Sequence, residues 1–165
     1  MLNSDSWMRQ VSQKLAGNAF VPLAPELYQP QGCKHAVRRT RFEISKFGMA
    51  ETFFTFAEIP NLTIDVLRQF SNASHQFAVA NKKVPLPSGL FELVFCFAVA
   101  ITANLNPQIA QYVRDNEPIK HWSAFELTVV YDLAGGGLYY SEKTPLWGAA
   151  YYAGFRREIQ ANLGG

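Results

Sequence analysis

The sequence contains few cysteines and few histidines: two and three, respectively, among 165 residues. Cys96 lies within the apolar run LFELVFCFAVAI, where a thiol usually serves as a small hydrophobic side chain. Cys33 lies instead in a segment rich in glycine and proline, so the two positions are unlike each other. This pattern favours reduced thiols and predicts a cytoplasmic protein.

Long apolar runs and a strong charge imbalance are also missing. The most apolar segment, residues 93–103, has about half the length that a membrane-spanning helix needs. The first residues contain no apolar run of the kind found in a signal peptide. The formal net charge of +2 is too small to indicate nucleic-acid binding by itself. We therefore expect no membrane segment, and only a local basic cluster could support a nucleic-acid site.

Common catalytic and cofactor motifs are absent, because the sequence has no HExxH, CxxC, GxGxxG or GxxxxGK[ST] pattern. The three histidines lie far apart, and none has a cysteine or histidine at metal-ligand spacing. The glycines at 135–137 precede a strand pattern, so they indicate a turn and not a phosphate-binding loop. The sequence thus predicts no metal and no cofactor, and it favours a non-catalytic protein over an enzyme.

Apolar residues make up 48% of the chain and aromatic residues 14%, which is enough for a packed core. Their spacing predicts one α+β domain over residues 1–165. Residues 1–36 are expected to form an amphipathic helix and a proline-rich wrapping arm, and residues 37–165 the sheet and its helices. The predicted order is α-ββ-α-β-α-ββ-α, with about five strands in a mostly antiparallel sheet.

The elements follow from the spacing of apolar residues and from the residues that cap or break helices. A hairpin is expected over residues 38–60, with its turn at Gly48, and a second hairpin over residues 121–143. Residues 90–103 are apolar on both alternations, which is typical of a central strand covered on both faces. Helices are expected over residues 5–16, 61–83, 106–118 and 146–163.

Residues 34–41 bring five cationic or titratable side chains into one short segment: Lys34, His35, Arg38, Arg39 and Arg41. Such a cluster can hold a phosphate or another anion, and it would make nucleic-acid binding strongly salt-dependent. The same residues also suit an edge strand protected by charge, or arginines paired with nearby glutamates. The pattern favours these structural roles and leaves anion or nucleic-acid binding as an alternative.

His121 stands at the start of a predicted strand, with Glu126 on that strand and Asp132 at its end. These three residues are the best candidates for acid–base chemistry on a small anionic or phosphorylated substrate. A hydrogen-bonded structural histidine is the commoner role for such a position. The acid-and-lysine pattern of metal-dependent nucleases is incomplete here, because Ser141 occupies the position two residues before Lys143.

The closing segment, TPLWGAAYYAGFRREIQANLGG, divides into two faces on a helical wheel. One face is the predicted core face and contains Gly148, Tyr151, Tyr152, Phe155, Ile159 and Leu163. The flank beside it combines a large ring with small residues, and two tyrosines of the preceding hairpin are expected nearby. This flank comprises Trp147, Ala150, Gly154, Tyr139 and Tyr140.

A ring beside small residues suits a contact with a second copy of the chain or with a protein partner. Cover by the N-terminal helix is the alternative for this flank. The sequence therefore predicts, first, an interaction domain that self-associates or binds a macromolecular partner. An enzyme acting on a small anion and a nucleic-acid-binding protein are the alternative interpretations.

Overall fold

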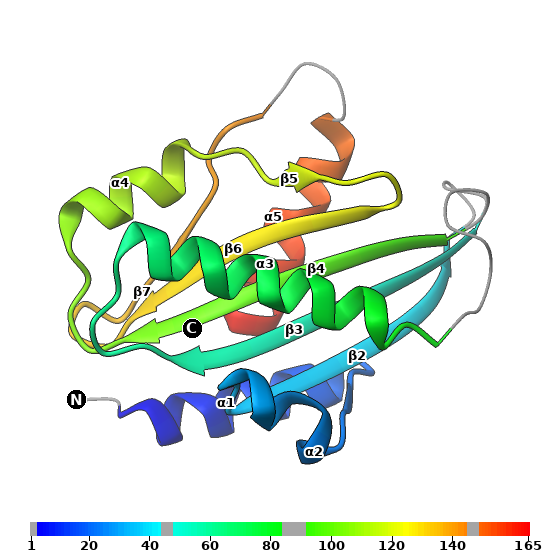
Figure 1. Cartoon of the computed structure of the whole chain (residues 1–165), viewed down its shortest axis with the longest axis horizontal. Helices are drawn as coiled ribbons and strands as arrows, with labels where there is room; N and C mark the ends of the chain where they lie inside the picture. The colour runs from blue at the N-terminus through cyan, green and yellow to red at the C-terminus, as the bar shows by residue number, and fades with distance from the viewer. Residues whose placement is uncertain (1–2, 44–47, 84–91, 145–148) are drawn as a thin grey trace.

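The computed structural model describes residues 3–43, 48–83, 92–144 and 149–165 (Figure 1). Within these ranges the chain forms one seven-stranded sheet and five α-helices. The strands are β1 Val21–Pro22, β2 His35–Glu43, β3 Gly48–Glu58, β4 Glu92–Thr102, β5 Ile119–Lys120, β6 Ala124–Asp132 and β7 Gly137–Tyr140. The helices are α1 Ser4–Gly17, α2 Pro25–Tyr28, α3 Ile64–Ala80, α4 Pro107–Asp115 and α5 Ala149–Leu163, with a 3-10 turn at Gln29–Gln31.

The prediction of a mostly antiparallel sheet of about five strands was wrong. The strand order is β1-β2-β3-β4-β6-β5, with β7 also paired to β6, and β3, β4 and β6 run parallel to one another. The reason is the connections: α3 joins β3 to β4, and α4 lies between β4 and β6. A helical crossover returns the chain to the starting end of the sheet and makes the two strands parallel. The two further strands, β1 and β5, have two residues each, which is too short for a periodic pattern.

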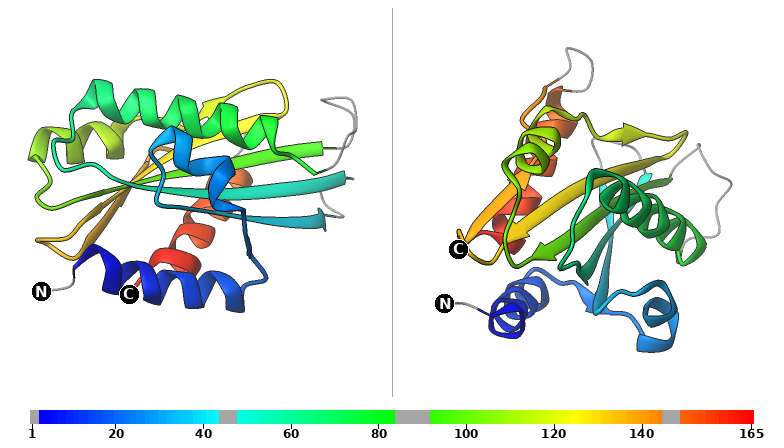
Figure 2. Two further views of the ribbon diagram at one scale, coloured as in Figure 1. Left: turned by 60° about the horizontal axis from the view of Figure 1, so that its bottom comes forward. Right: turned by 60° about the vertical axis from the view of Figure 1, so that its left-hand side comes forward.

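Helices cover both faces of the sheet (Figures 1 and 2). α2, α3 and α4 pack on one face, and α1 and α5 pack on the other. Alternate residues of β3 serve the two cores: Phe53 contacts the α3 side, whereas Phe54 contacts the α5 side. β4 is buried on both faces, as predicted for residues 90–103. None of the described helices is long and apolar enough to cross a membrane.

Local sequence sets where the helices beside β6 begin. The Thr63 side chain accepts a hydrogen bond from the Val66 amide at 3.2 Å, and α3 starts directly after Thr63, at Ile64. The Asn106 side chain accepts one from the Gln108 amide at 2.8 Å, and Pro107 occupies the first turn of α4. Both caps agree with the sequence-based prediction that helices begin near residues 61 and 106.

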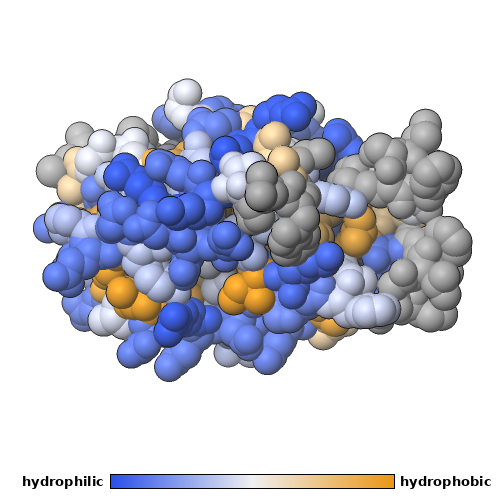
Figure 3. All heavy atoms as spheres, turned by 90° about the horizontal axis from the view of Figure 1, so that it is seen from above, coloured by the Kyte–Doolittle hydropathy of each residue, from blue (hydrophilic) through white to orange (hydrophobic). Residues whose placement is uncertain are grey.

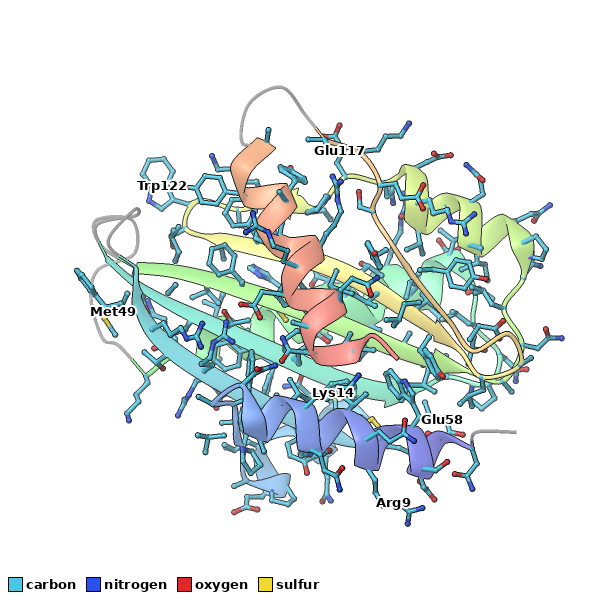
Figure 4. All side chains as sticks on the ribbon, turned by 180° about the vertical axis from the view of Figure 1, so that it is seen from behind. Arg9, Lys14, Met49, Glu58, Glu117 and Trp122 are labelled. Atoms are coloured by element: carbon cyan, nitrogen blue, oxygen red, sulfur yellow. The ribbon has the colours of Figure 1, made fainter. Side chains whose placement is uncertain are left out.

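A buried arginine joins β2 to α5. Arg39 is buried and pairs with Glu158 of α5, and its guanidinium lies 4.4 Å from the centroid of the Phe20 ring. The two helices on this face are also linked directly, because Asn18 Nδ2 donates to Asn162 Oδ1 at 2.9 Å. Lys14 of α1, labelled in Figure 4, donates to the carbonyl oxygen of Gly164. This face of the sheet is therefore closed by polar links as well as by apolar packing.

Replacing Arg39 with alanine is expected to lower the free energy of unfolding by about 2 kcal/mol, because Glu158 would lose its cationic partner and keep only the hydrogen bond from Asn162. Arg41 lies on the same strand but is exposed, and its replacement by alanine should change stability by less than about 0.5 kcal/mol. Urea denaturation of both variants measures the difference. Equal, small losses in the two variants would show that the pair with Glu158 does not stabilise the fold.

Candidate functional site

The outer edge of β6 is divided between two short strands. β5 pairs with β6 at Phe125 and Glu126, and β7 pairs with it from Val129 to Asp132. Leu127 and Thr128 lie between these pairings and have no strand partner on this edge among the described residues. A cavity of about 450 Å³ opens at this divided edge. Its walls come from helices on both faces of the sheet.

Most of the cavity wall is apolar or aromatic. Tyr152, Phe155 and Ile159 line it from α5, and Leu67 and Val113 line it from α3 and α4. The charged residues of the lining are Arg68, Glu117, Glu126 and Arg156. Of these four, only the glutamate at position 126 is buried, with an exposed fraction of 4%. The cavity therefore has one deep charged group and three charged groups near its mouth.

A histidine holds the buried carboxylate by one of its two oxygens. His121 Nε2 lies 3.0 Å from Glu126 Oε2. The tight turn from β5 to β6 brings the two residues together, and the His121 amide donates to the carbonyl of Ala124 at 2.8 Å. The His121 side chain is 36% exposed, so it links the buried carboxylate to solvent. Oε1 of Glu126 accepts no hydrogen bond from any residue that the structure describes.

A second imidazole stacks on the first. The rings of His75 and His121 have centroids 3.8 Å apart and planes 11° apart. His75 comes from α3 and is 9% exposed, and its Nδ1 is buried without a partner in the described part of the chain. Burial lowers the pKa of His75, the nearby His121 lowers it further, and Glu126 acts in the opposite direction. Two rings in such close contact disfavour two positive charges, so this imidazole pair accepts one proton more readily than two.

Hydroxyl pairs fix the helix that carries His75. Thr128 Oγ1 donates to Ser71 Oγ at 3.1 Å, and Thr55 Oγ1 donates to Ser74 Oγ at 2.9 Å. Both serines lie on the buried face of α3. Ser71 and Thr128 also line the cavity, where they add neutral hydrogen-bonding groups beside the carboxylate. Within the described ranges, no three His, Cys, Asp or Glu side chains are placed to hold a metal ion.

Asp132, the third acid–base candidate from the sequence, does not reach this cavity. It lies six residues beyond Glu126 on the same strand, which corresponds to about 20 Å. Its carboxylate accepts hydrogen bonds from the amides of Leu105 and Ala134, both at 3.2 Å, and of Gly135 at 3.1 Å. A Cβ atom on Gly135 would lie 2.7 Å from Oδ2 of Asp132. Asp132 therefore closes the turn between β6 and β7.

The basic segment lies elsewhere in the sheet, on β2 and just before it, with β3 and β4 between it and β6. Lys34 pairs with Glu58, and the hydrogen bond between them raises the pKa of the lysine and lowers that of the carboxyl. Arg38 donates to the carbonyl of Asn81 at 3.0 Å. Together with the buried Arg39, these contacts engage three of the five predicted anion-binding residues in the fold itself.

The other two residues of the basic segment differ in exposure. His35 is half-buried between the rings of Tyr28 and Phe56, and burial lowers its pKa. Arg41 is exposed near the end of β2. Neither residue lines the cavity. The structure therefore separates the basic segment from the pair formed by His121 and Glu126.

The predicted partner-contact flank falls only partly within the described residues. The Arg114 guanidinium lies 5.0 Å from the centroid of the Tyr139 ring, and the Tyr140 hydroxyl accepts a hydrogen bond from Gln160 at 2.7 Å. Gly154 adjoins open space, since a Cβ atom there would meet no atom within 4 Å. Trp147 and the side chain of Ala150 lie outside the described part of the chain. Tyr140 also lines the cavity, so the flank and the cavity share a wall.

Replacing His75 with glutamine is expected to reduce the loss of stability in acid. In the wild type, the folded-state pKa of His75 lies below its unfolded value of about 6.5. The unfolded chain therefore binds a proton that the folded chain does not, and stability falls as the pH drops below about 6.5. Urea denaturation at pH 7.5 and 5.5 should show a smaller loss in His75→Gln. His35 acts in the same direction in both proteins, so equal losses would contradict the role given to His75.

Comparison with known proteins adds nothing to this geometry, because no protein-family model, curated protein or solved structure matches the chain. The cavity, the buried carboxylate of Glu126 and the two stacked imidazoles are therefore the features from which a function has to be inferred. They lie together at one edge of the sheet: β6 supplies Glu126, the turn before it supplies His121, and α3 supplies His75.

Proposed function

We propose that the chain binds a small organic molecule in the cavity at the divided edge of β6, with Glu126 as the polar anchor. The cavity volume of about 450 Å³ falls within the range of ligand pockets, about 300 to 1,000 Å³. Its lining combines apolar and aromatic side chains with polar groups that can orient a ligand.

The observation that carries this proposal is a buried carboxylate facing an apolar cavity. Removing a carboxylate from water costs several kcal/mol unless hydrogen bonds and an opposite charge compensate it. His121 engages one oxygen of Glu126, and no described residue engages the other. A ligand that donates a hydrogen bond to the second oxygen would complete the site.

The proposal keeps two of the three acid–base residues expected from the sequence. Glu126 and His121 adjoin the cavity, whereas Asp132 and the basic segment have structural contacts elsewhere. A carboxylate hydrogen-bonded to an imidazole that reaches solvent is an arrangement able to move protons. Acid–base chemistry on the bound molecule therefore stays a prediction for this pair. Ligand binding is the function proposed for the cavity.

Filling the cavity tests the proposal. Thr128 lines it, so Thr128→Phe should weaken the binding of a panel of aromatic amines, alcohols and carboxylic acids at least about tenfold. Thr40→Phe, on β2 and away from the cavity, is the matched control and should bind like the wild type. Ligand-observed NMR measures the affinities. Equal affinities in all three proteins, or no binding to the wild type, would contradict the proposal.

We propose self-association as a second function, on the strength of exposed apolar residues beside the cavity. Trp122 is 84% exposed and Ile119 is 54% exposed, and both belong to the segment that forms β5 and the turn into β6. Figure 4 shows Trp122 projecting away from the sheet. An open strand edge with apolar neighbours suits an isologous contact with a second copy. Figure 3, which views the side of β5 and α4, shows separate apolar patches between hydrophilic side chains.

Because these patches are separate, a contact between two copies would bury a limited area, and a weak, concentration-dependent dimer is expected. Light scattering over a range of protein concentrations should show the mass rising for the wild type and remaining that of the monomer for Trp122→Ala. Trp147→Ala tests the contribution of the flank expected from the sequence. A monomeric wild type at every concentration would rule out this second function.

A further inference from the structure

We propose that the ligand of this cavity is an organic amine, whose ammonium group binds Glu126 in exchange for a proton held by the imidazole pair of His121 and His75. This inference rests on the proposed function, and it adds the chemical class of the ligand and the way in which its binding depends on pH. It follows from the charges around one buried carboxylate.

The charge of the site depends on whether His121 carries a proton. With a protonated imidazole 3.0 Å away, the carboxylate of Glu126 has a counter-charge. With a neutral imidazole, the 4%-exposed carboxylate has no counter-charge from a described neighbour. An ionised group in that state is strongly stabilised by any cation that enters the cavity. The cavity therefore selects a positively charged ligand whenever the imidazole pair is neutral.

The cavity walls favour an ammonium group attached to an apolar body. The rings of Tyr140, Tyr152 and Phe155 line the cavity, and ring faces attract organic cations. The Tyr112 ring already contacts a cation, because the Arg68 guanidinium lies 5.4 Å from the centroid of the Tyr112 ring. The remaining rings and the aliphatic side chains can accommodate a hydrocarbon or aromatic group. A small inorganic cation would leave these walls without contacts.

The proton has a route out of the site. His121 contacts the carboxylate through Nε2, and its ring is partly exposed to solvent. His75, which stacks on His121, does not readily accept a proton while His121 is charged. Burial and the close imidazole both lower the pKa of His75. An ammonium group at Glu126 would be a further positive charge beside the pair. Proton release from His121 to solvent removes this repulsion and leaves one cation at the carboxylate.

Other titratable groups around the pair do not supply this proton. Cys96 pairs with Glu126 across β4 and β6, and burial raises the pKa of its thiol, so the thiol stays neutral. Lys120 precedes His121 and is exposed. The charged side chains at the mouth are Arg68, Glu117 and Arg156, all exposed or half-buried. Charges at these positions are screened by salt and act on the carboxylate less strongly than the imidazoles do.

Three probes that share a phenyl ring test the inference: phenethylamine, 2-phenylethanol and 3-phenylpropionate. At pH 7.5 phenethylamine should bind the wild type at least about tenfold more tightly than the neutral alcohol, and the carboxylate should bind most weakly. The affinity for the amine should be higher at pH 7.5 than at pH 5.5, because an imidazole pair without a proton leaves the carboxylate free to bind the ammonium group. The amine itself stays protonated over this range, as lysine does.

Two variants separate the roles of the residues. Glu126→Gln, which keeps the shape of the side chain, should remove both the preference for the amine over the alcohol and the pH dependence. His121→Gln should still bind the amine at pH 7.5, with a change of less than about threefold between the two pH values, because the exchanged proton is absent. Isothermal titration calorimetry in two buffers of different ionisation enthalpy measures the affinities and the protons released.

The outcomes distinguish this inference from the function on which it rests. If amine and alcohol bind the wild type equally and without pH dependence, the amine inference is wrong and binding in the cavity stands. The same holds if the pH dependence survives in His121→Gln. If none of the three probes binds the wild type more tightly than Thr128→Phe, both the inference and the proposed function are contradicted.

Discussion

The hydrogen bond between Glu126 and His121 is the interaction on which the site depends. It allows an ionisable carboxylate to remain buried on β6, at the point where the strand loses its outer partner between β5 and β7. Without a partner, a buried carboxylate would be too costly to keep ionised. The fold supplies the rest: α3 places His75 against His121, and α5 and α4 wall the cavity on opposite faces of the sheet.

The sequence predicted most of the elements but not how the central strands run. The apolar alternations of β4 and the cap at Asn106 are local signals, and both predictions were confirmed. The parallel direction of β3, β4 and β6 had a signal too, because a helical pattern separates each successive pair and a strand apolar on both faces is typical of parallel sheets. The two hairpins, β2–β3 and β6–β7, carry a stronger local signal, and they favour an antiparallel sheet.

The site was predictable only where its residues are close in the chain. His121 and Glu126 are five residues apart across a tight turn, so the sequence could suggest them as a pair. His75 comes from a separate helix, and its one signal was the run of polar residues on the buried face of α3. Arg39 alternates with Val37, and both are buried, so the strand pattern held a hint that this arginine faces inward. The cavity depends on a gap between β5 and β7, which no local pattern encodes.

In the proposed site, Oε1 of Glu126 receives a cation from the cavity while His121 engages Oε2. A crystal structure with phenethylamine at pH 7.5 tests this most directly. Electron density for the amine is expected in the cavity, with its nitrogen about 2.7 to 3.2 Å from Oε1 of Glu126 and its ring against Tyr152 and Phe155. Density that places the amine outside the cavity, or its nitrogen away from Glu126, would contradict the account.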